Sequence, residues 1–216
     1  MYALTTAELM DRPDLWRAVH ALRHEVFVDE IGLEYLRRPN GLEVDAFDHD
    51  EAVHHLVFRD GALAGYQRLL PTTRPHLLTT VLRDLFVVAP PCGPNVFEIT
   101  RRIVARSHRG GRRGVATVGN ELIAGLIEWS LARGVDSLVI ALEPSWVLRA
   151  LQLHFIATPL GYQRTRGRRQ LVATLLAFDR HTLHVVRSRS NHFTPVLCEG
   201  LPGDGSAGSA ALSRAS

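Results

Sequence analysis

Four carboxylates crowd one short stretch of the chain, GLEVDAFDHD. They are Glu43, Asp45, Asp48 and Asp50. Carboxylates gathered this closely bind cations, which can be arginine side chains of the same protein or positive groups of a ligand. Arg23 and Phe27 precede them at a spacing of four residues, so a helix would place this guanidinium and this ring on one face. A salt-bridged loop around a half-buried Phe47 would explain the same pattern.

Arg68 is the second candidate for chemistry, because it interrupts an apolar, strand-like segment. In GYQRLLPTT it stands next to Leu69 and Leu70, shortly before a proline-bounded turn. A charge in a strand can lie at a sheet edge, where it discourages aggregation. It can also project into a cleft, where a guanidinium binds a carboxylate or another anion. The sequence leaves both possibilities open.

Glu98 is the third candidate and lies in the segment FEITRR. A glutamate in a central strand is costly to bury, so it is either the partner of a cation or an acid or base with a shifted pKa. Because side chains alternate along a strand, Glu98, Thr100 and Arg102 are expected on one face. Ile99 and Arg101 are expected on the other face, unless a bulge intervenes.

Two arginine clusters supply most of the excess positive charge, RSHRGGRR at 106–113 and RTRGRR at 164–169. Guanidinium groups bind phosphates, acidic proteins or nucleic acid, and a solvated basic surface is the alternative. Nucleic acid is not expected as a partner, because no aromatic residues interleave the arginines and no helix-turn-helix or zinc spacing accompanies them. The first cluster loosely resembles the pyrophosphate loop of the Gcn5-related acyltransferases, which makes Arg109, Arg112 and Arg113 candidate ligands of a carrier phosphate.

The composition is that of one globular domain. The chain has 216 residues, of which 46% are hydrophobic and 22% charged, with a net charge of +3. We expect one domain over 1–198 and a disordered tail rich in Gly, Ser and Ala over 199–216. No stretch of about 18 apolar residues is present, so neither a membrane span nor an export signal is expected. Cys92 and Cys198 fit no metal-ligand spacing, which favours free thiols in the cytoplasm and no bound metal.

Alternating helices and strands must position the candidate residues. Apolar residues at three- and four-residue steps predict a helix over 14–30, and Asp60-Gly61 predicts a hairpin turn between two strands over 52–70. A long apolar helix is predicted from Val115 to Arg133, ended by Gly134. The other predicted elements are a helical turn at 81–86, a strand at 96–104, a strand at 136–142, a helix at 145–155 capped by Ser145, and strands at 158–165 and 169–179. This order indicates an α/β fold in which helices cover the faces of a mixed sheet.

Four segments, in this order, resemble the signature segments of a known enzyme family. They are LRHEVFVDEIGLEY, GLEVDAFDHDEAVHHLVF, GYQRLLPTT and FEITR. The family is the acyl-homoserine lactone synthases, which carry out autoinducer synthesis in bacterial quorum sensing, and the resemblance covers residues from about 20 to 105. It implies an α/β, three-layer mixed-sheet sandwich resembling the Gcn5-related acyltransferase fold, which agrees with the predicted order of elements.

The resemblance implies a transferase with two substrates and no cofactor. An acyltransferase of this family moves an acyl group from acyl-CoA or acyl carrier protein to the α-amine of S-adenosyl-L-methionine. The methionine carboxylate then closes the lactone ring and expels methylthioadenosine. The arginine clusters suit the phosphates of coenzyme A and an acidic carrier protein equally, so the carrier stays open.

The family's functional positions fall on the candidate residues. The resemblance implies that S-adenosylmethionine binds at Arg23, Phe27, Asp45, Asp48 and Arg68. It implies that Glu98 and Arg101 are catalytic, with Glu98 as general base because an amine must lose a proton before it attacks a thioester. The acyl pocket is assigned to Phe86, Thr100 and Ala141. Among the four clustered carboxylates, Glu43 and Asp50 are expected to matter least.

The sequence departs from the family pattern at several positions. Leu33 stands where the family has tryptophan, so an aromatic wall of the nucleoside pocket is missing or supplied by Tyr35. His54 replaces the usual tyrosine, and Thr100 replaces a serine. Ala141 stands where synthases that take 3-oxo chains often have a hydroxyl, which favours an unsubstituted, branched or aryl acyl group.

Two other functions stay open at this point. One is a related N-acyltransferase that acylates another amine or amino acid, for which Leu33 and His54 are the best support. It would transfer acyl groups without releasing methylthioadenosine. The other is a non-catalytic relative that binds acyl carriers. Glu98 argues against the second function, because a binding protein has little use for a buried base.

Overall fold

An eight-stranded mixed sheet forms the centre of the described part of the protein. The computed structural model describes residues 1–110, 117–198 and 201. The strands are β1 (Tyr2–Thr5), β2 (Val53–Arg59), β3 (Ala62–Pro71), β4 (Val96–Val104), β5 (Ser137–Leu142), β6 (Ile156–Pro159), β7 (Arg164–Arg166) and β8 (Arg169–Ala177). They lie in the order β1-β2-β3-β4-β5-β8-β6, and β7 pairs with β8 beside this path. Strands β4 and β5 run parallel and the other paired strands run antiparallel, which confirms the predicted mixed sheet.

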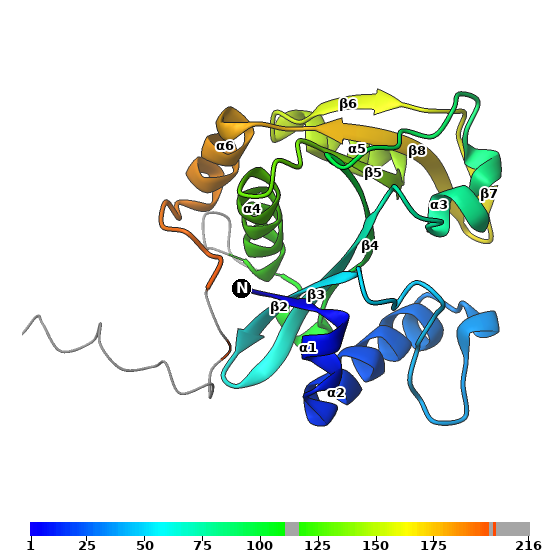
Figure 1. The fold of residues 1–216 in the computed structure, drawn as a ribbon, viewed down its shortest axis with the longest axis vertical. Helices are drawn as coiled ribbons and strands as arrows, with labels where there is room; N and C mark the ends of the chain where they lie inside the picture. The colour runs from blue at the N-terminus through cyan, green and yellow to red at the C-terminus, as the bar shows by residue number, and fades with distance from the viewer. Residues whose placement is uncertain (111–116, 199–200, 202–216) are drawn as a thin grey trace, which may run out of the picture.

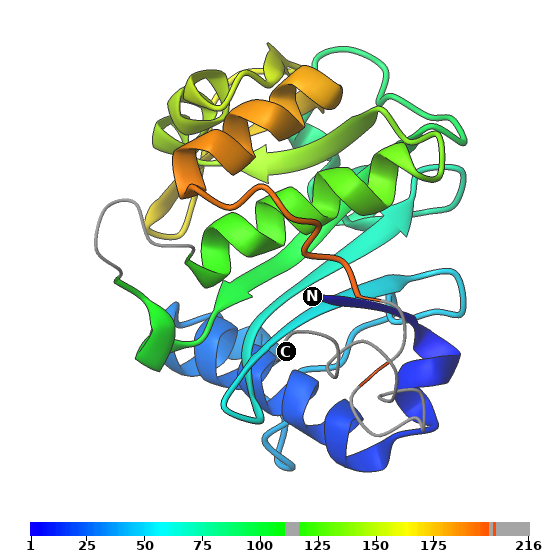
Figure 2. The same ribbon diagram turned by 90° about the vertical axis from the view of Figure 1, so that its left-hand side faces the viewer.

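Helices cover both faces of the sheet and give three layers (Figures 1 and 2). The helical segments are α1 (Thr6–Met10), α2 (Pro13–His24), the π-helical η1 (Glu25–Glu30), η2 (Glu34–Leu36), α3 (Leu77–Thr80), η3 (Arg83–Leu85), η4 (Arg106–His108), α4 (Val118–Leu131), α5 (Pro144–Gln152) and α6 (Arg180–Ser190). Leu9 of α1 and Val19 of α2 pack with Tyr66 of β3 on one face. Ile127 of α4 and Val186 of α6 pack with Leu69 of β3 on the other. No helix in the described ranges combines the length and the apolar composition that crossing a bilayer requires.

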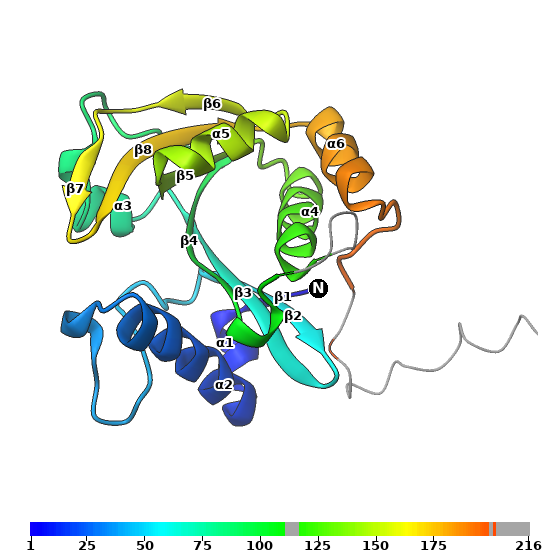
Figure 3. The same cartoon turned by 180° about the vertical axis from the view of Figure 1, so that it is seen from behind.

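Strands β4 and β5 part in the middle of the sheet. They are paired over Val96–Glu98 and Ser137–Val139, whereas β4 continues to Val104 and β5 to Leu142. Seen from behind, the sheet is strongly curved, with β2 and β3 at one end and β6 and β8 at the other (Figure 3). Glu98 is therefore the last residue of β4 that pairs with β5 before these two strands separate.

Strong local signals explain why most predicted elements are confirmed. Asp60 and Gly61 adopt φ values of 51° and 78° at the turn between β2 and β3, as a tight hairpin demands. Helix α4 begins after Thr117, whose side chain accepts a hydrogen bond from the N–H of Asn120. The chain leaves α4 through Gly134, which has a φ of 71°.

The structure differs from the predicted elements at several places. Helix α5 begins at Pro144 rather than after Ser145, because the proline ring presets the helical φ and no side chain caps this end. The helical turn expected at 81–86 is divided between α3 and η3, and the strand expected at 158–165 between β6 and β7. The sequence does not predict β1, α1 or α6. Helix α6 is mostly polar, and its beginning depends on a capping box rather than on an apolar pattern.

Candidate active site

The acidic stretch folds into a tight loop that its own carboxylates hold. The Oδ1 of Asp45 accepts a hydrogen bond from the N–H of Phe47, and the Oδ2 of Asp48 accepts one from the N–H of Asp45, both at 2.9 Å. Aspartate commonly closes turns in this way. The N–H of Glu43 donates to the carbonyl oxygen of His20 in α2 at 3.0 Å. The loop is therefore fastened to the preceding helix.

Three guanidinium groups meet three carboxylates of this loop on one face of the sheet. The ion-pair network consists of Arg23, Arg68, Arg101, Glu43, Asp45 and Asp48. Arg23 of α2 is fully buried and donates from Nε to Glu43 and from Nη1 to Asp48, both at 2.6 Å. Charges are costly to bury unless they are paired, so the network explains how the chain keeps these residues inside.

Arg68 reaches the same carboxylates from β3. Its Nη1 and Nη2 bind the two oxygens of Asp45 at 2.7 and 3.0 Å, and Nη1 also donates to Asp48 at 2.6 Å. Its Nε donates to the hydroxyl of Thr100 at 3.1 Å. Because β3 lies between β2 and β4, the alternative that Arg68 is an edge charge is wrong. Arg68 is a carboxylate clamp within the protein.

A bulge in β4 brings Arg101 onto the face of the network. The register between β3 and β4 shifts at this point, and Arg101 has a φ of 51°, which is uncommon for a residue with a side chain. As a result, Thr100 and Arg101 both contact the network, whereas Arg102 donates to a carbonyl oxygen of α4 on the other face. The bulge that the sequence left open is therefore present, and the regular alternation along β4 ends at Arg101.

Glu43 is more deeply involved than the sequence predicts. Arg101 donates to its two oxygens at 3.0 and 2.8 Å and to Asp45 at 2.7 Å, and lies over the ring of Phe27 at 5.0 Å. Burial raises the pKa of Glu43, but hydrogen bonds from Arg101 and the charges of two arginines outweigh burial and lower this pKa to about 2. Asp50 is exposed, by contrast, and pairs with Arg74 at 3.0 Å. The expectation that Glu43 is peripheral is wrong.

Two buried histidines of β2 make stability depend on pH, His54 on the face of the network and His55 on the opposite face. Burial lowers the pKa of His54 and of His55 to about 3 each, from about 6.5 in an unfolded chain. Between these values the unfolded chain binds a proton at each histidine that the folded protein does not bind, so the free energy of unfolding falls as the pH falls. Glu43 acts in the same direction below pH 4.5, because its pKa is lowered in the folded state.

We therefore expect the free energy of unfolding to fall by roughly 1–2 kcal/mol per histidine between pH 7 and pH 5. Urea unfolding at several pH values measures this slope. His55→Gln should reduce the slope, whereas His184→Gln, on the exposed side of α6, should leave it unchanged. Equal free energies of unfolding at pH 7 and pH 5 would contradict the prediction.

Glu98 points to the beginning of α3. Its Oε2 accepts a hydrogen bond from the N–H of Leu77 and its Oε1 one from the N–H of Leu78, both at 2.9 Å, and its side chain is 1% exposed. It lies two positions from Thr100 and hence on the face of the ion-pair network. Within the described ranges, backbone N–H groups rather than a guanidinium group hold this carboxylate.

Two of the three predicted acyl-pocket residues lie against one apolar cluster. Phe86 and Ala141 pack against buried residues of α3, η3, β5 and β8 and the loop after β6: Leu78, Leu85, Val139, Leu160, Leu171 and Ala173. Thr100 is separate from this cluster and belongs beside Arg68. Leu78 supplies both an N–H to Glu98 and a side chain to the cluster, so the cluster adjoins the buried carboxylate.

Gly161 holds the segment that carries Phe86. A Cβ at Gly161 would overlap the carbonyl oxygen of Leu85 and lie 3.2 Å from the N of Val87. We expect Gly161→Ala to lower the free energy of unfolding by about 1–3 kcal/mol, because the packed segment must move. Gly119→Ala in α4 is the matched control, since its added Cβ would lie 3.8 Å from the nearest atom. Urea unfolding compares the two variants, and equal stability would refute this account of Gly161.

The predicted phosphate ligands are described only in part. Arg109 donates from Nε to the carbonyl oxygen of Val104 at 2.7 Å and also pairs with Glu30. Arg112 and Arg113 lie outside the described residues, and so does the predicted tail apart from Leu201. The phosphate assignment and the disordered tail therefore stay predictions.

The positions that depart from the family pattern are accounted for in different ways. Leu33 is half-buried, and Tyr35 is 70% exposed, so Tyr35 does not wall the site in this structure. His54 is fully buried, with Nδ1 2.7 Å from the hydroxyl of Tyr66 and Nε2 3.0 Å from that of Thr6. His54 therefore belongs to the packing beneath the network.

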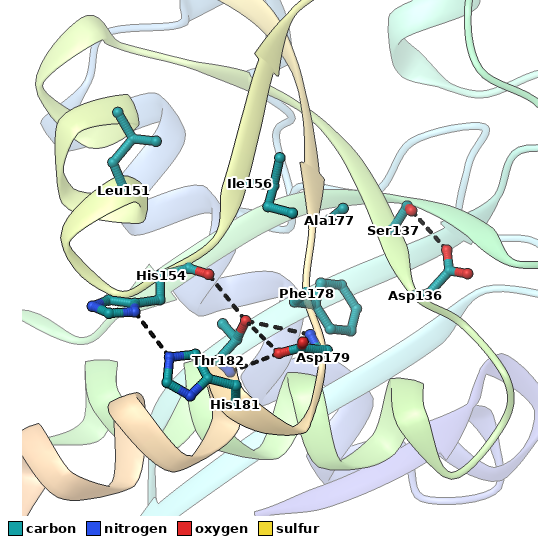
Figure 4. Close-up of a pocket in the computed structure, with 10 residues that line it drawn as sticks. All are labelled: Asp136, Ser137, Leu151, His154, Ile156, Ala177, Phe178, Asp179, His181 and Thr182. Atoms are coloured by element: carbon teal, nitrogen blue, oxygen red, sulfur yellow. Dashed lines mark hydrogen bonds between the residues drawn. The ribbon is translucent and has the colours of Figure 1, made fainter.

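A pocket unrelated to these residues lies where β5 begins and β8 ends (Figure 4). Exposed His154 and His181 face each other there, with Nδ1 and Nε2 3.1 Å apart, and the hydroxyl of Thr182 donates to the carbonyl oxygen of His154. None of the predicted site residues lines this pocket. The candidate active site is thus the network and Glu98, not this hollow.

The mixed sheet, in which two parallel strands part beside a buried carboxylate, is a fold shared with solved structures that include an acyl-CoA N-acyltransferase. An acyl-CoA N-acyltransferase from Pseudomonas aeruginosa has the same fold, with a TM-score of 0.56 and 19% identity over 81% of this chain and 97% of that chain. Escherichia coli ElaA is similar in fold as well, with a TM-score of 0.57 and 18% identity over 80% of this chain and 95% of that chain. The predicted fold is confirmed.

Acyl-homoserine lactone synthases resemble the chain over most of its length. The profile of the family described as autoinducer synthase matches residues 6–182. The isovaleryl-homoserine lactone synthase of Bradyrhizobium diazoefficiens is 32% identical over 169 residues, covering 78% of this chain and 75% of that protein. The acyl-homoserine-lactone synthase of Ralstonia solanacearum is 34% identical over 167 residues, covering 74% and 80%.

A solved structure agrees with this assignment. The CoA-dependent acyl-homoserine lactone synthase BjaI, with S-adenosylmethionine and isopentyl-CoA, has a TM-score of 0.84 and 29% identity over 93% of each chain. The chain therefore belongs to the autoinducer synthase family. The family predicted from the sequence and its enzyme class, an acyltransferase that makes acyl-homoserine lactones, are confirmed.

Proposed function

We propose that the chain makes its acyl-homoserine lactone from S-adenosylmethionine and an acyl-CoA. The acyl group is short, straight or branched, and carries no oxygen substituent. The observation that carries the proposal is the ion-pair network on the face of the sheet that also holds Glu98. The relatives support the substrates, because BjaI is known with S-adenosylmethionine and isopentyl-CoA and another relative is an isovaleryl-homoserine lactone synthase. The proposed reaction needs no cofactor, and the proposed location is the cytoplasm, where both substrates are found.

The accessible edge of the network presents one positive and one negative group, and each could bind a part of S-adenosylmethionine that has the opposite charge. Arg101 and Asp45 have side chains that are 9% and 13% exposed. Asp45 would attract the sulfonium or the ammonium, and Arg101 the carboxylate, with Phe27 against the adenosyl group. Arg23 and Arg68 are fully buried and bind the acidic loop, so in this proposal they hold the loop rather than the substrate.

Glu98 is the proposed general base. It takes a proton from the α-ammonium, directly or through a water, and the free amine attacks the thioester carbonyl. An N–C bond forms, the C–S bond breaks, the second proton lost by the amine goes to sulfur, and coenzyme A leaves as its thiol. The methionine carboxylate then attacks its own γ-carbon, the C–S bond of the sulfonium breaks, and neutral methylthioadenosine leaves. The two N–H groups of α3 fix the carboxylate for the first step.

The apolar cluster beside α3 is the proposed acyl site. Its members are aliphatic apart from Phe86, and Ala141 is paired in register with Ala173 of β8, so no hydroxyl faces an acyl chain from these positions. A 3-oxo group buried there would lack a hydrogen-bond partner, which is unfavourable. The lining therefore supports an acyl group without an oxygen substituent.

The experiment that tests the proposal supplies purified protein with S-adenosylmethionine and a panel of acyl donors. The panel contains isovaleryl-CoA, butanoyl-CoA, benzoyl-CoA, 3-oxohexanoyl-CoA and hexanoyl-acyl carrier protein. Mass spectrometry should detect a lactone from a branched or unsubstituted acyl-CoA, with one methylthioadenosine released for each thiol. Thiol release without methylthioadenosine would overturn the proposal in favour of another amine acceptor. Lactone formed from the carrier protein alone would overturn the choice of coenzyme A.

A further inference from the structure

His76 is a buried histidine in contact with the proposed base, and no step described so far uses it. Its side chain is 1% exposed, and its Nδ1 lies 3.1 Å from the Oε2 of Glu98, which is equally buried. His76 immediately precedes α3, so its imidazole approaches the same carboxylate as the N–H groups of Leu77 and Leu78. Three groups therefore surround the Glu98 carboxylate.

This contact indicates which nitrogen of His76 carries a proton. A deprotonated Nδ1 would place a lone pair 3.1 Å from an anionic oxygen, which is repulsive. His76 is also the N-cap residue of α3, where an acceptor nitrogen could receive a helical N–H. The N–H of Thr79 donates to the carbonyl oxygen of His76 at 3.1 Å, and Nδ1 has no hydrogen-bond partner of its own in the described part of the chain. A proton on Nδ1 would remove the repulsion from Glu98.

The ring nitrogens of His76 give an independent reason to look for a role. Both are buried, and neither has a hydrogen-bond partner of ordinary geometry in the described part of the chain, although Nδ1 approaches the Oε2 of Glu98 to 3.1 Å. An unpaired buried polar atom is costly, and in a native protein it calls for an explanation. A leucine would fill an apolar position next to Leu78 without this cost. The imidazole is explained if Nδ1–H is needed at Glu98.

The contacts are distributed unequally over the two oxygens of Glu98. Oε2 faces both the N–H of Leu77 and the imidazole of His76, whereas Oε1 receives the N–H of Leu78. We propose that His76 is a positioning residue whose Nδ1–H fixes the carboxylate, so that Oε1 is the oxygen that takes the proton of the amine. This inference rests on the proposed function, in which Glu98 is the base.

Kinetics of two variants test this positioning role. The amide nitrogen of His76→Asn can take the place of Nδ1–H, whereas the side chain of His76→Leu cannot donate. We expect His76→Leu to lower kcat about tenfold with KM for both substrates unchanged, and His76→Asn to stay within about threefold of the parent. His55→Leu removes a buried imidazole on the opposite face and should affect stability alone. Equal kcat for the asparagine and leucine variants would overturn the inference.

NMR of [15N]histidine-labelled protein examines the same pair without any turnover. We expect His76 to carry a proton on Nδ1 and its signal to shift in Glu98→Gln. A deprotonated Nδ1 would overturn the inference whether or not a lactone is made. If Nδ1 is protonated as expected but no acyl donor yields a lactone, the proposed function fails while the His76–Glu98 contact stands.

Discussion

Glu98→Gln is expected to lower kcat for lactone formation by about 10²- to 10⁴-fold, with KM for both substrates nearly unchanged. The amide has no lone pair basic enough to take the proton of the attacking amine, although its size and position are the same. Glu98 lies where β4 and β5 part, with each oxygen held at 2.9 Å by a backbone N–H. Rates of thiol and methylthioadenosine release at saturating substrate measure the effect.

The same substitution disturbs α3, so it needs a matched control. A glutamine has one acceptor oxygen, so one of the two N–H groups loses its partner, at a cost of about 1–3 kcal/mol in stability. Thr79→Ala weakens the same turn by removing two hydrogen bonds between its hydroxyl and the backbone of His76, both 3.1 Å long. Thr79→Ala should keep most of kcat. A loss as large as that of Glu98→Gln would assign Glu98 a structural role instead.

Asp48→Asn is expected to lower the free energy of unfolding by about 3–5 kcal/mol, a large part of the stability of an ordinary domain. The Oδ1 of Asp48 accepts from Arg23 and from Arg68, both at 2.6 Å, so the variant leaves two buried guanidinium groups short of a countercharge. Burial opposes the ionised carboxyl, yet the nearby ring of His20 and these two arginines hold the pKa of Asp48 well below its usual range. Urea unfolding measures the loss.

Asp50→Asn is the matched control for Asp48→Asn. It removes the same charge two positions away, from an exposed pair with Arg74. Exposed ion pairs contribute little, so this variant should stay within about 0.5 kcal/mol of the parent. If Asp48→Asn is as stable as Asp50→Asn, the ion-pair network does not hold the loop to the sheet.

The charged residues of the site can be found from the sequence because their settings are unfavourable for charge. Arg68 and Glu98 lie within apolar strand segments, where a charge must be paired or functional. The helical spacing of Arg23 and Phe27 places both toward the acidic loop. Such residues can be recognised from their neighbours in the sequence, without knowing which distant residues they contact.

The partners of these residues depend on tertiary structure and could not be predicted. Glu43 is one of four nearby carboxylates, and only the turns closed by Asp45 and Asp48 decide that it faces inward. No glycine marks the bulge at Arg101, so the sequence does not indicate that its side chain changes face. His76 reaches Glu98 because α3 docks at β4, a contact 22 residues apart in the chain.

The fold was predictable where an element has its own pattern. The hairpin at Asp60-Gly61 and the apolar helix before Gly134 carry strong signals. Strand β1 spans four residues, too few for an alternation to be recognised, and exists because it pairs with β2. Helix α6 is largely polar and gains its stability by packing on α4, where Arg187 binds Glu128 at 2.9 Å.

The ion-pair network carries no net charge, since its three guanidinium groups balance its three carboxylates. A balanced set of charges exerts almost no field beyond the Debye length, which is about 8 Å at physiological salt. In the proposed function, the network itself therefore does not steer a sulfonium substrate toward the site from a distance. In that proposal, recognition begins on contact with the accessible edge at Asp45 and Arg101, and we expect the network to make the rate of capture depend little on salt concentration.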